Sequence, residues 1–265
     1  MSVETQHKSY TENINTWHML RDCDDGARAV KSRSAGGEAQ TLQGERGTKY
    51  LPPPNPTDLS IENRLRYRAY RNRANYVNFV GSTREGLCGL VWRKDPVIEL
   101  GSSLEYMASN ANGDGLPLEG MLRSALNEAL LMGRYGLLVD YPTTPDGMTR
   151  AQVASQGLQA NILPYRAETI INWQCTTMGG VRMLSLLVLM EDINIQGEDE
   201  YSYDTVTVYR VLRLNDAGAY TQALYDKDGI ELMPPTEVRK SDGSLWRSIP
   251  FVFVGSVNND EQVDK

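Results

Sequence analysis

The chain has 265 residues, of which 40% are hydrophobic; this is enough to build one large core or two smaller ones and excludes a chain that is disordered throughout. The formal charge is −7, but residues 61–94 carry eight basic and two acidic side chains, a local charge of +6 that leaves −13 for the remainder. Such segregation of charge bears on partners and assembly rather than on fold.

Residue usage argues against most catalytic and metal chemistry. Only two histidines are present, and the three cysteines (Cys23, Cys88 and Cys175) lack the paired spacing of a zinc site or a redox couple. The chain has no GxSxG, Walker-type or GxGxxG motif. Its longest apolar run, at 183–190, is too short to cross a bilayer, and the N-terminus lacks a signal pattern. We expect no enzyme activity, cofactor, metal or membrane contact, and a reducing compartment.

The first 60 residues predict one helix followed by irregular chain. Ile14 and Trp17 recur at helical spacing within a short helix at Tyr10–Asp22. Residues 24–49 are rich in small, polar and glycine residues without a hydrophobic period, so we expect a loop or mobile arm. Prolines 52–54 and 56 then favour an extended segment.

The stretch RLRYRAYRNRANYVNF, residues 64–79, predicts one amphipathic helix that Asp58 or Ser60 caps. Two adjacent stripes of apolar side chains are expected to be buried: Tyr67, Tyr70, Ala74 and Val77 in one, and Leu65, Ala69, Tyr76 and Phe79 in the other. Arg64, Arg68 and Arg71 lie on a separate face. The helix should end at VGSTREGLCG, residues 80–89, and the proline-interrupted stretch at 90–100 should form an edge strand.

Residues 117–142 predict a helix, a tight turn and a buried strand. Pro117 suits the start of the helix, Gly133 can close it in the left-handed conformation, and YGLLVDYP is a strand that Pro142 ends. Beyond about residue 160, strand-like runs alternate with the turn signals NDAG, KDG and SDG, which is typical of antiparallel hairpins.

The predicted fold class is α+β, with helices in the N-terminal half packed with a largely antiparallel β-sheet or meander in the C-terminal half. We expect three regions: an N-terminal helix with a mobile Gly/Pro-rich arm at 1–56, a helical region ending in a buried strand at 57–145, and a β-rich region at 146–265.

Three acidic or amide-rich stretches are weak candidates for sites. NANGDG, residues 110–115, matches the first half of a calcium loop, but Met121 stands where the bidentate glutamate belongs, so a polar turn is the better interpretation. Asp140, at a strand end, would be the centre of a carboxylate-dependent hydrolase, although a turn-capping aspartate is far commoner there. Residues 191–204 hold six acidic side chains and no basic one.

The arginines of 64–73 admit two interpretations. Together with exposed aromatic side chains they would bind nucleic acid through phosphate contacts and stacking, but helical spacing places the aromatics on a face that should be buried. We favour the other interpretation, in which they pair with acidic patches on an adjacent subunit. The candidate residues, at a subunit interface or facing DNA, are Arg64, Arg68, Arg71 and Arg73.

An ordered set of segments resembles the N-terminal part of the portal-like structural proteins of tailed bacteriophages. The segments are YLPPP, RYRAYRNRANYVNFVGSTREGLCGLVWRKDP, GLPLEGMLRSALNEALLMGRYGLLVDYP, PYRAETIINWQ and WRSIPFVFVG, over residues 15–258. GRYGLLVDYP followed by YRAETIINW is the most specific part. The resemblance implies the outer wing of a portal, a mixed helix and sheet domain.

In that family the portal is a ring, typically of twelve copies, at one capsid vertex. The resemblance implies a structural virion protein that forms the head–tail connector and the channel for genome packaging and ejection, assembled in the host cytoplasm. Its partners would be its own copies, the major capsid protein, the terminase, adaptor or neck proteins and genomic double-stranded DNA. Portal chains continue past the segment matching IPFVFVG into stem, clip and crown, so we expect this chain to be truncated before them. The alternative function is a nucleic-acid-binding module that uses the basic helix 64–73.

Overall fold

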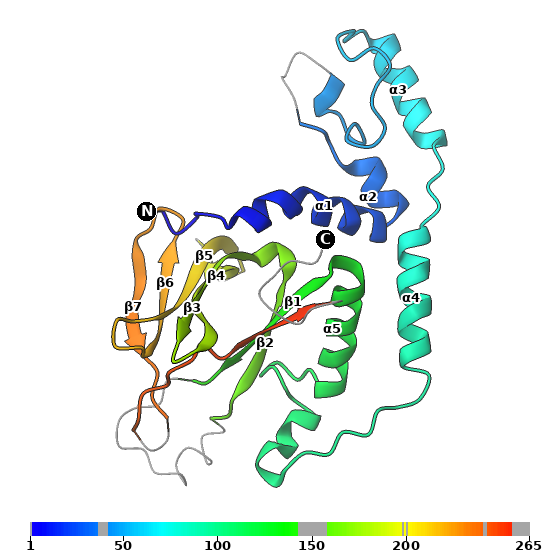
Figure 1. Ribbon diagram of the computed structural model, residues 1–265. Coiled ribbons are helices and arrows are strands. Elements are labelled where there is room, and N and C mark those ends of the chain that lie inside the picture. Colours follow the sequence, from blue (N-terminus) through cyan, green and yellow to red (C-terminus); the bar gives the residue numbers. More distant parts are fainter. Residues whose placement is uncertain are drawn as a thin grey trace. The chain divides into compact units, whose positions relative to one another are not determined.

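The structure is a computed structural model that describes residues 2–36, 42–142, 158–197, 199, 201–240 and 243–255 (Figure 1). Helices occupy the N-terminal half and antiparallel strands the C-terminal half, which confirms the predicted α+β class. The chain divides into two compact units. We call Asn15–Asp95 the helical unit, and Met1–Ile14 together with Pro96–Lys265 the sheet unit; helix α1, Lys8–Asp24, contributes to both.

The helical unit contains more helix than the sequence predicts. Besides the end of α1, its helices are α2 (Ala27–Ser32), η1 (Leu42–Gly44), α3 (Ile61–Arg73) and α4 (Phe79–Val91). Helices α2 and η1 lie inside 24–49, so the prediction of an irregular stretch is wrong there. A helix of six residues or fewer is too short to show a hydrophobic period, which is why the sequence did not reveal them.

The predicted helix over 64–79 is two helices in the structure, and Figure 1 shows the non-helical connection between α3 and α4. As predicted, Ser60 caps α3, since its Oγ accepts a hydrogen bond from the Asn63 amide at 3.2 Å. The helix ends at Arg73, because Ala74 has extended backbone angles (φ −57°, ψ 132°).

Helix α4 begins after Asn78, whose Oδ1 accepts a hydrogen bond from the Gly81 amide at 2.8 Å. It continues to Val91, straight through the segment that was expected to end a helix. The edge strand predicted at 90–100 is also wrong, because residues 92–100 form turns and irregular chain.

The sheet unit contains the helix and the strand that the sequence predicts at 117–142. Helix η2 is Ser102–Ala108, α5 is Leu118–Met132 and β1 is Arg134–Asp140; Gly133, between α5 and β1, is left-handed with φ of 71°. Strand β1 is the centre of a three-stranded antiparallel sheet, between β2 (Asn161–Arg166) and β8 (Phe251–Gly255). Helix α5 packs beside β1 and β8 (Figure 1).

The remaining strands form a five-stranded antiparallel meander in chain order. They are β3 (Ile170–Met178), β4 (Val181–Gln196), β5 (Tyr203–Leu214), β6 (Tyr220–Asp226) and β7 (Glu231–Glu237). The predicted antiparallel hairpins are therefore confirmed for β4, β5 and β6. Strand β8 lies outside this meander and pairs with β1, a long-range partnership that carries no local signal.

An aromatic stack joins the two sheets to the N-terminal segment. The guanidinium of the buried Arg134 lies 4.3 Å from the Trp173 ring centre and 4.1 Å from that of Phe253, and the His7 ring stacks on Trp173 at 4.0 Å. The amide of His7 also donates a hydrogen bond to the Ile171 carbonyl at 2.9 Å. Cation–π contacts of this kind stabilise a buried guanidinium.

Candidate assembly surface

Three of the four candidate arginines on α3 face a turn of their own unit. Arg64 Nη1 lies 3.0 Å from Glu45 Oε1, and Arg68 Nη2 lies 3.9 Å from the same oxygen. Arg71 Nη1 donates a hydrogen bond to the Arg46 carbonyl at 3.1 Å. Arg64, Arg68 and Arg71 therefore share a face of α3, as predicted, and each contacts an oxygen atom of residue 45 or 46 within the helical unit. The Arg68 contact, at 3.9 Å, is the longest of the three, and the Arg68 side chain is 53% exposed.

The fourth candidate, Arg73, lies on another side of the helix. Its Nε donates a hydrogen bond to the Ala69 carbonyl one turn earlier, and its side chain is exposed. Arg66, which the sequence did not single out, is exposed near it and forms an i,i+4 ion pair with Glu62. Exposed pairs of this kind contribute little to stability, so both guanidinium groups remain available for a partner.

The aromatic side chains of the basic stretch are not buried as a stripe. Tyr67 is buried, and its hydroxyl donates a hydrogen bond to the Arg46 carbonyl at 3.0 Å. Tyr70, Val77 and Phe79, however, are 41%, 65% and 74% exposed. Leu65 is 58% exposed and Ala69 is exposed as well, so the prediction of burial is wrong for all five residues. The break at 74–78 ends the helical phase for Val77 and Phe79, whereas Leu65, Ala69 and Tyr70 lie within α3, whose buried residues are Asn63 and Tyr67.

Helix α4 exposes large apolar side chains and buries small ones. Its buried residues are Gly81 and Cys88, whereas Phe79, Leu87 and Leu90 are 74%, 44% and 70% exposed. At about 100° per residue, these three fall within about 80° of one another, roughly opposite Gly81 and Cys88. We call Phe79, Leu87 and Leu90 the α4 stripe.

Contiguous exposed apolar patches are typical of interaction sites, which makes the α4 stripe a candidate for one. The sequence analysis missed it because GSTREG was interpreted as a helix end. The signal that was available is the recurrence of large apolar residues at positions 79, 87 and 90, which share one helical face.

Charge is divided between the two units. The helical unit carries 14 basic and 9 acidic residues, a formal charge of +5, and the sheet unit carries 13 basic and 25 acidic residues, a formal charge of −12. The net charges of the two units are therefore opposite in sign.

A buried carboxylate, that of Asp22, links three segments of the helical unit. Asp22, on α1, accepts hydrogen bonds from Arg33 Nε (2.6 Å), Lys49 Nζ (3.0 Å) and the Tyr50 hydroxyl (2.7 Å). Burial opposes ionisation of the carboxyl, but these three donors outweigh it and hold the pKa of Asp22 below its usual value. The cluster ties α1 to the chain that follows α2 and to the loop before α3.

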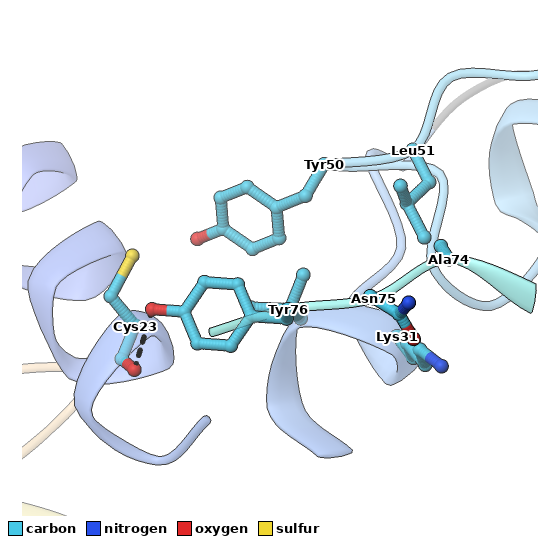
Figure 2. Close-up of a pocket in the computed structure, with 8 residues that line it drawn as sticks. Cys23, Lys31, Tyr50, Leu51, Ala74, Asn75 and Tyr76 are labelled. Carbon is cyan, nitrogen blue, oxygen red and sulfur yellow. Dashed lines mark hydrogen bonds between the residues drawn. The ribbon is translucent and has the colours of Figure 1, made fainter. Parts of the chain in front are cut away.

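A cavity of about 220 Å³ lies in the helical unit where the α3–α4 connection packs (Figure 2). Figure 2 shows the hydroxyls of Tyr50 and Tyr76 pointing toward Cys23, and the Tyr76 hydroxyl donates a hydrogen bond to the Cys23 carbonyl at 2.8 Å. Burial, followed by the contact with Cys23, raises the pKa of Tyr76 to about 12. Lys31 Nζ donates a hydrogen bond to the Asn72 carbonyl at 3.2 Å. The Lys31, Tyr50 and Tyr76 side chains are thus engaged by the protein itself, which favours a gap in the packing over a ligand site.

Asp140 belongs to an ionic cluster between the sheets. Arg210 contacts Asp140 Oδ2 at 3.5 Å and Glu191 Oε1 at 2.6 Å, and Glu191 also accepts a 2.5 Å hydrogen bond from the Tyr165 hydroxyl. Burial, and then the Glu191 charge, raise the pKa of Tyr165, so it remains protonated and donates to Glu191. The acidic stretch at 191–204 therefore has a basic partner in space, Arg210, that its sequence does not contain. Glu198 and Glu200 of that stretch lie outside the described residues.

The NANGDG loop is a polar turn. Asn110 Oδ1 accepts hydrogen bonds from the amides of Gly113 and Gly115, and Asn112 Oδ1 accepts them from Asp114 and Leu116. Both amide oxygens that a calcium ion would need are thereby occupied. Within the described parts of the chain, no cluster of three or more histidine, cysteine, aspartate or glutamate side chains is arranged to hold a metal ion.

Comparison with protein-family models and with curated proteins found no match for this chain. Among the residues that the structure describes, no helix has both the length and the apolar character needed to cross a bilayer.

Proposed function

We propose that this protein is a structural, ring-forming subunit, the wing portion of a phage portal at the capsid vertex. The observation that carries the proposal is the pairing of an exposed apolar stripe on α4 with a division of charge, +5 on the helical unit and −12 on the sheet unit. The α4 stripe is one candidate surface for assembly, and the opposite net charges of the two units favour contacts between unlike units of neighbouring copies.

Two different complementary surfaces are what a ring requires. A two-fold dimer buries the same patch of both copies, whereas a ring buries patch A of one copy against a different patch B of the next. The ring closes when an integral number of these rotations makes one full turn. In the proposed ring, apolar contact along α4 stabilises the interface between neighbouring copies. The opposite net charges of the helical and sheet units favour contacts between unlike units and disfavour contacts between two helical units or two sheet units.

The role of the ring follows from the resemblance of the ordered segments to the portal family. In this role the ring, with about a dozen copies, is the channel for packaging and ejecting genomic double-stranded DNA, held in the major capsid protein shell and bound by terminase and then by adaptor or neck proteins. The residues that support assembly in this chain are the α4 stripe and the exposed arginines Arg66, Arg68 and Arg73.

Light scattering of the purified chain tests assembly. We expect the mass to rise with protein concentration from 29.6 kDa for a single chain toward a multiple of that value, and the assembled fraction to fall with added salt because the charged contacts are screened. A mass that stays at that of a single chain at every concentration and salt would overturn the proposal.

One observation favours a second function, nucleic-acid binding by α3. Tyr70 is 41% exposed and lies on the same side of α3 as the exposed Arg66 and Arg73, so one stacking surface is available that the sequence analysis had placed in the core. Binding of this kind weakens steeply with salt and loses about one unit of salt slope for each phosphate-contacting arginine removed. Absence of binding to single- or double-stranded DNA at low salt excludes this function and leaves assembly unaffected.

A further inference from the structure

A short strap precedes helix α1 and is attached to the five-stranded sheet. We define the strap as residues 2–7, which form turns and irregular chain. The Tyr209 hydroxyl of β5 donates a hydrogen bond to Glu4 Oε1 at 3.2 Å, and the Asn172 side chain of β3 donates one to the Thr5 carbonyl at 2.8 Å. Both of these strap residues are exposed. Segments with few buried contacts open locally at a lower free energy than the core does, so the strap is a candidate for local release.

His7, at the end of the strap, is attached to β3 through both its backbone and its ring. Its amide donates a hydrogen bond to the Ile171 carbonyl at 2.9 Å. Its ring stacks on the buried Trp173 ring, with 4.0 Å between the ring centres and 23° between the planes. Its Nδ1 accepts a hydrogen bond at 3.1 Å from the amide of Ser9, which lies in the first turn of α1, where amides have no acceptor within the helix. One imidazole therefore holds both the strap and the start of α1.

These ring contacts require a neutral imidazole. A protonated Nδ1 carries a hydrogen atom and accepts no hydrogen bond, so the Ser9 amide would lose its acceptor. The guanidinium of Arg134 lies 4.3 Å from the centre of the same Trp173 ring, so a protonated His7 would place a second positive charge beside this indole. Repulsion between the two charges and the lost hydrogen bond both disfavour the docked strap.

The other charged groups near His7 do not offset this penalty. Glu12 of α1 favours protonation, but burial and the Arg134 charge outweigh it and hold the pKa of His7 below its ordinary value. The Glu12 carboxylate also lies 3.9 Å from Lys8 Nζ in an exposed ion pair, and the Glu4 carboxylate accepts its hydrogen bond from β5. Strands β3 and β8 contain no acidic or basic residue. The surroundings of the ring therefore favour the neutral form on balance.

We propose that His7 is a pH-dependent latch, whose protonation releases the strap from β3 while both sheets stay folded. Because β3 is an outermost strand of its sheet, release removes the strap from the Ile171 carbonyl and uncovers one side of the Trp173 ring. An open strand edge of this kind is where a further strand pairs. The latch concerns the sheet unit of a single chain and does not depend on the proposed ring.

Hydrogen exchange of single amides tests the latch. Protection factors, which remove the direct effect of pH on exchange, are compared between about pH 7.5 and about pH 5 in the unmodified chain. We expect protection of the His7 and Ser9 amides to fall by up to about tenfold for each pH unit below 6.5, until the folded pKa is reached, because release takes up one proton. Protection of the paired amides of β4 and β5 should change by less than about twofold.

Two matched variants identify the titrating group. With His7→Gln, protection at positions 7 and 9 should be the same at both pH values. His18→Gln removes an exposed histidine of the same helix α1 and should keep the fall. Protected amides in β4 and β5 show that each variant folds.

Three results would overturn the inference. The first is equal protection of positions 7 and 9 at both pH values in the unmodified chain. The second is an equal fall in β4 and β5, which would mean that the whole sheet unit unfolds. The third is the same fall in His7→Gln as in the unmodified chain.

Discussion

His7 caps helix α1 and docks the N-terminal segment on the sheet unit. Its Nδ1 accepts a hydrogen bond from the Ser9 amide at 3.1 Å, and its ring stacks on Trp173. Burial lowers the pKa of His7, and the Arg134 charge lowers it further, while Glu12 partly opposes them. Neutral His7 is therefore the form that the fold holds, since a protonated Nδ1 accepts no hydrogen bond.

This lowered pKa makes the stability dependent on pH. In the unfolded chain His7 has its ordinary pKa of 6.5, and in the folded chain its pKa is lower. The contribution of neutral His7 to the free energy of unfolding is therefore full above pH 6.5 and is lost as the pH falls through the folded pKa. We expect the melting temperature to fall between about pH 7.5 and 5.5, and His7→Gln to flatten this part of the profile. His18→Gln is the matched control and should keep the fall; an unchanged profile in His7→Gln would contradict the assignment.

Asp22 accepts hydrogen bonds from three other residues of the helical unit. Asp22→Ala should lower the free energy of unfolding by about 1–3 kcal/mol, a range kept modest because Arg33 and Lys49 remain 55% and 35% exposed and can be solvated. Because the pKa of Asp22 is lowered, its contribution is present above its ordinary value of 3.8 and is lost only as the pH falls below it. Urea denaturation measures the change.

The exposed neighbour Asp25 supplies the control for Asp22. Asp25→Ala should stay within about 0.5 kcal/mol of the unmodified chain, as surface substitutions usually do. Equal effects of the two substitutions would show that the buried cluster contributes nothing.

At the scale of single elements, local signals predicted α5, β1 and the hairpins of β4 to β6. Each of these has its signal in a short stretch, such as the left-handed Gly133 or the turn glycines Gly218 and Gly229. The break between α3 and α4 was missed because Ala74 and Tyr76 are compatible with a helix. Only the Asn78 cap marked a new start there.

Errors in the candidate site followed from that missed break. The burial predicted for Val77 and Phe79 assumed one helical phase through residue 79, and the α4 stripe could not be recognised without α4 itself. The pairing of β8 with β1 could not be predicted either, because contacts between distant segments leave no periodic pattern in either one.

The close packing of β1 and β8 makes a prediction about Gly136. A Cβ atom at this position would collide with the Phe251 ring and the Ile170 side chain, so Gly136→Ala should destabilise the protein by about 1–3 kcal/mol. Gly86 in α4 has open space around it, and Gly86→Ala should stabilise the helix by about 0.5–1 kcal/mol. Thermal unfolding of the two variants should thus shift in opposite directions, and a neutral Gly136→Ala would show that β8 does not pack there.

For the whole molecule, the division of charge predicts that α3 matters more for assembly than for folding. Arg68 lies 3.9 Å from Glu45 and is about half exposed, so Arg68→Glu should leave the melting temperature within about 3 °C while reducing assembly by about tenfold or more. Lys227→Glu makes the same charge change on an exposed turn of the sheet unit and should leave assembly intact. Loss of folding in Arg68→Glu, or equal loss of assembly in both variants, would contradict the proposed role of α3.

The central claim is that copies of this chain join head to tail into a closed ring, and electron microscopy of the assembled protein tests it most directly. The account predicts closed rings with rotational symmetry, because each copy uses two different surfaces related by a fixed rotation, and the resemblance to portal proteins implies about a dozen copies. Two-fold dimers, or single chains under all conditions in which the protein is folded, would contradict it.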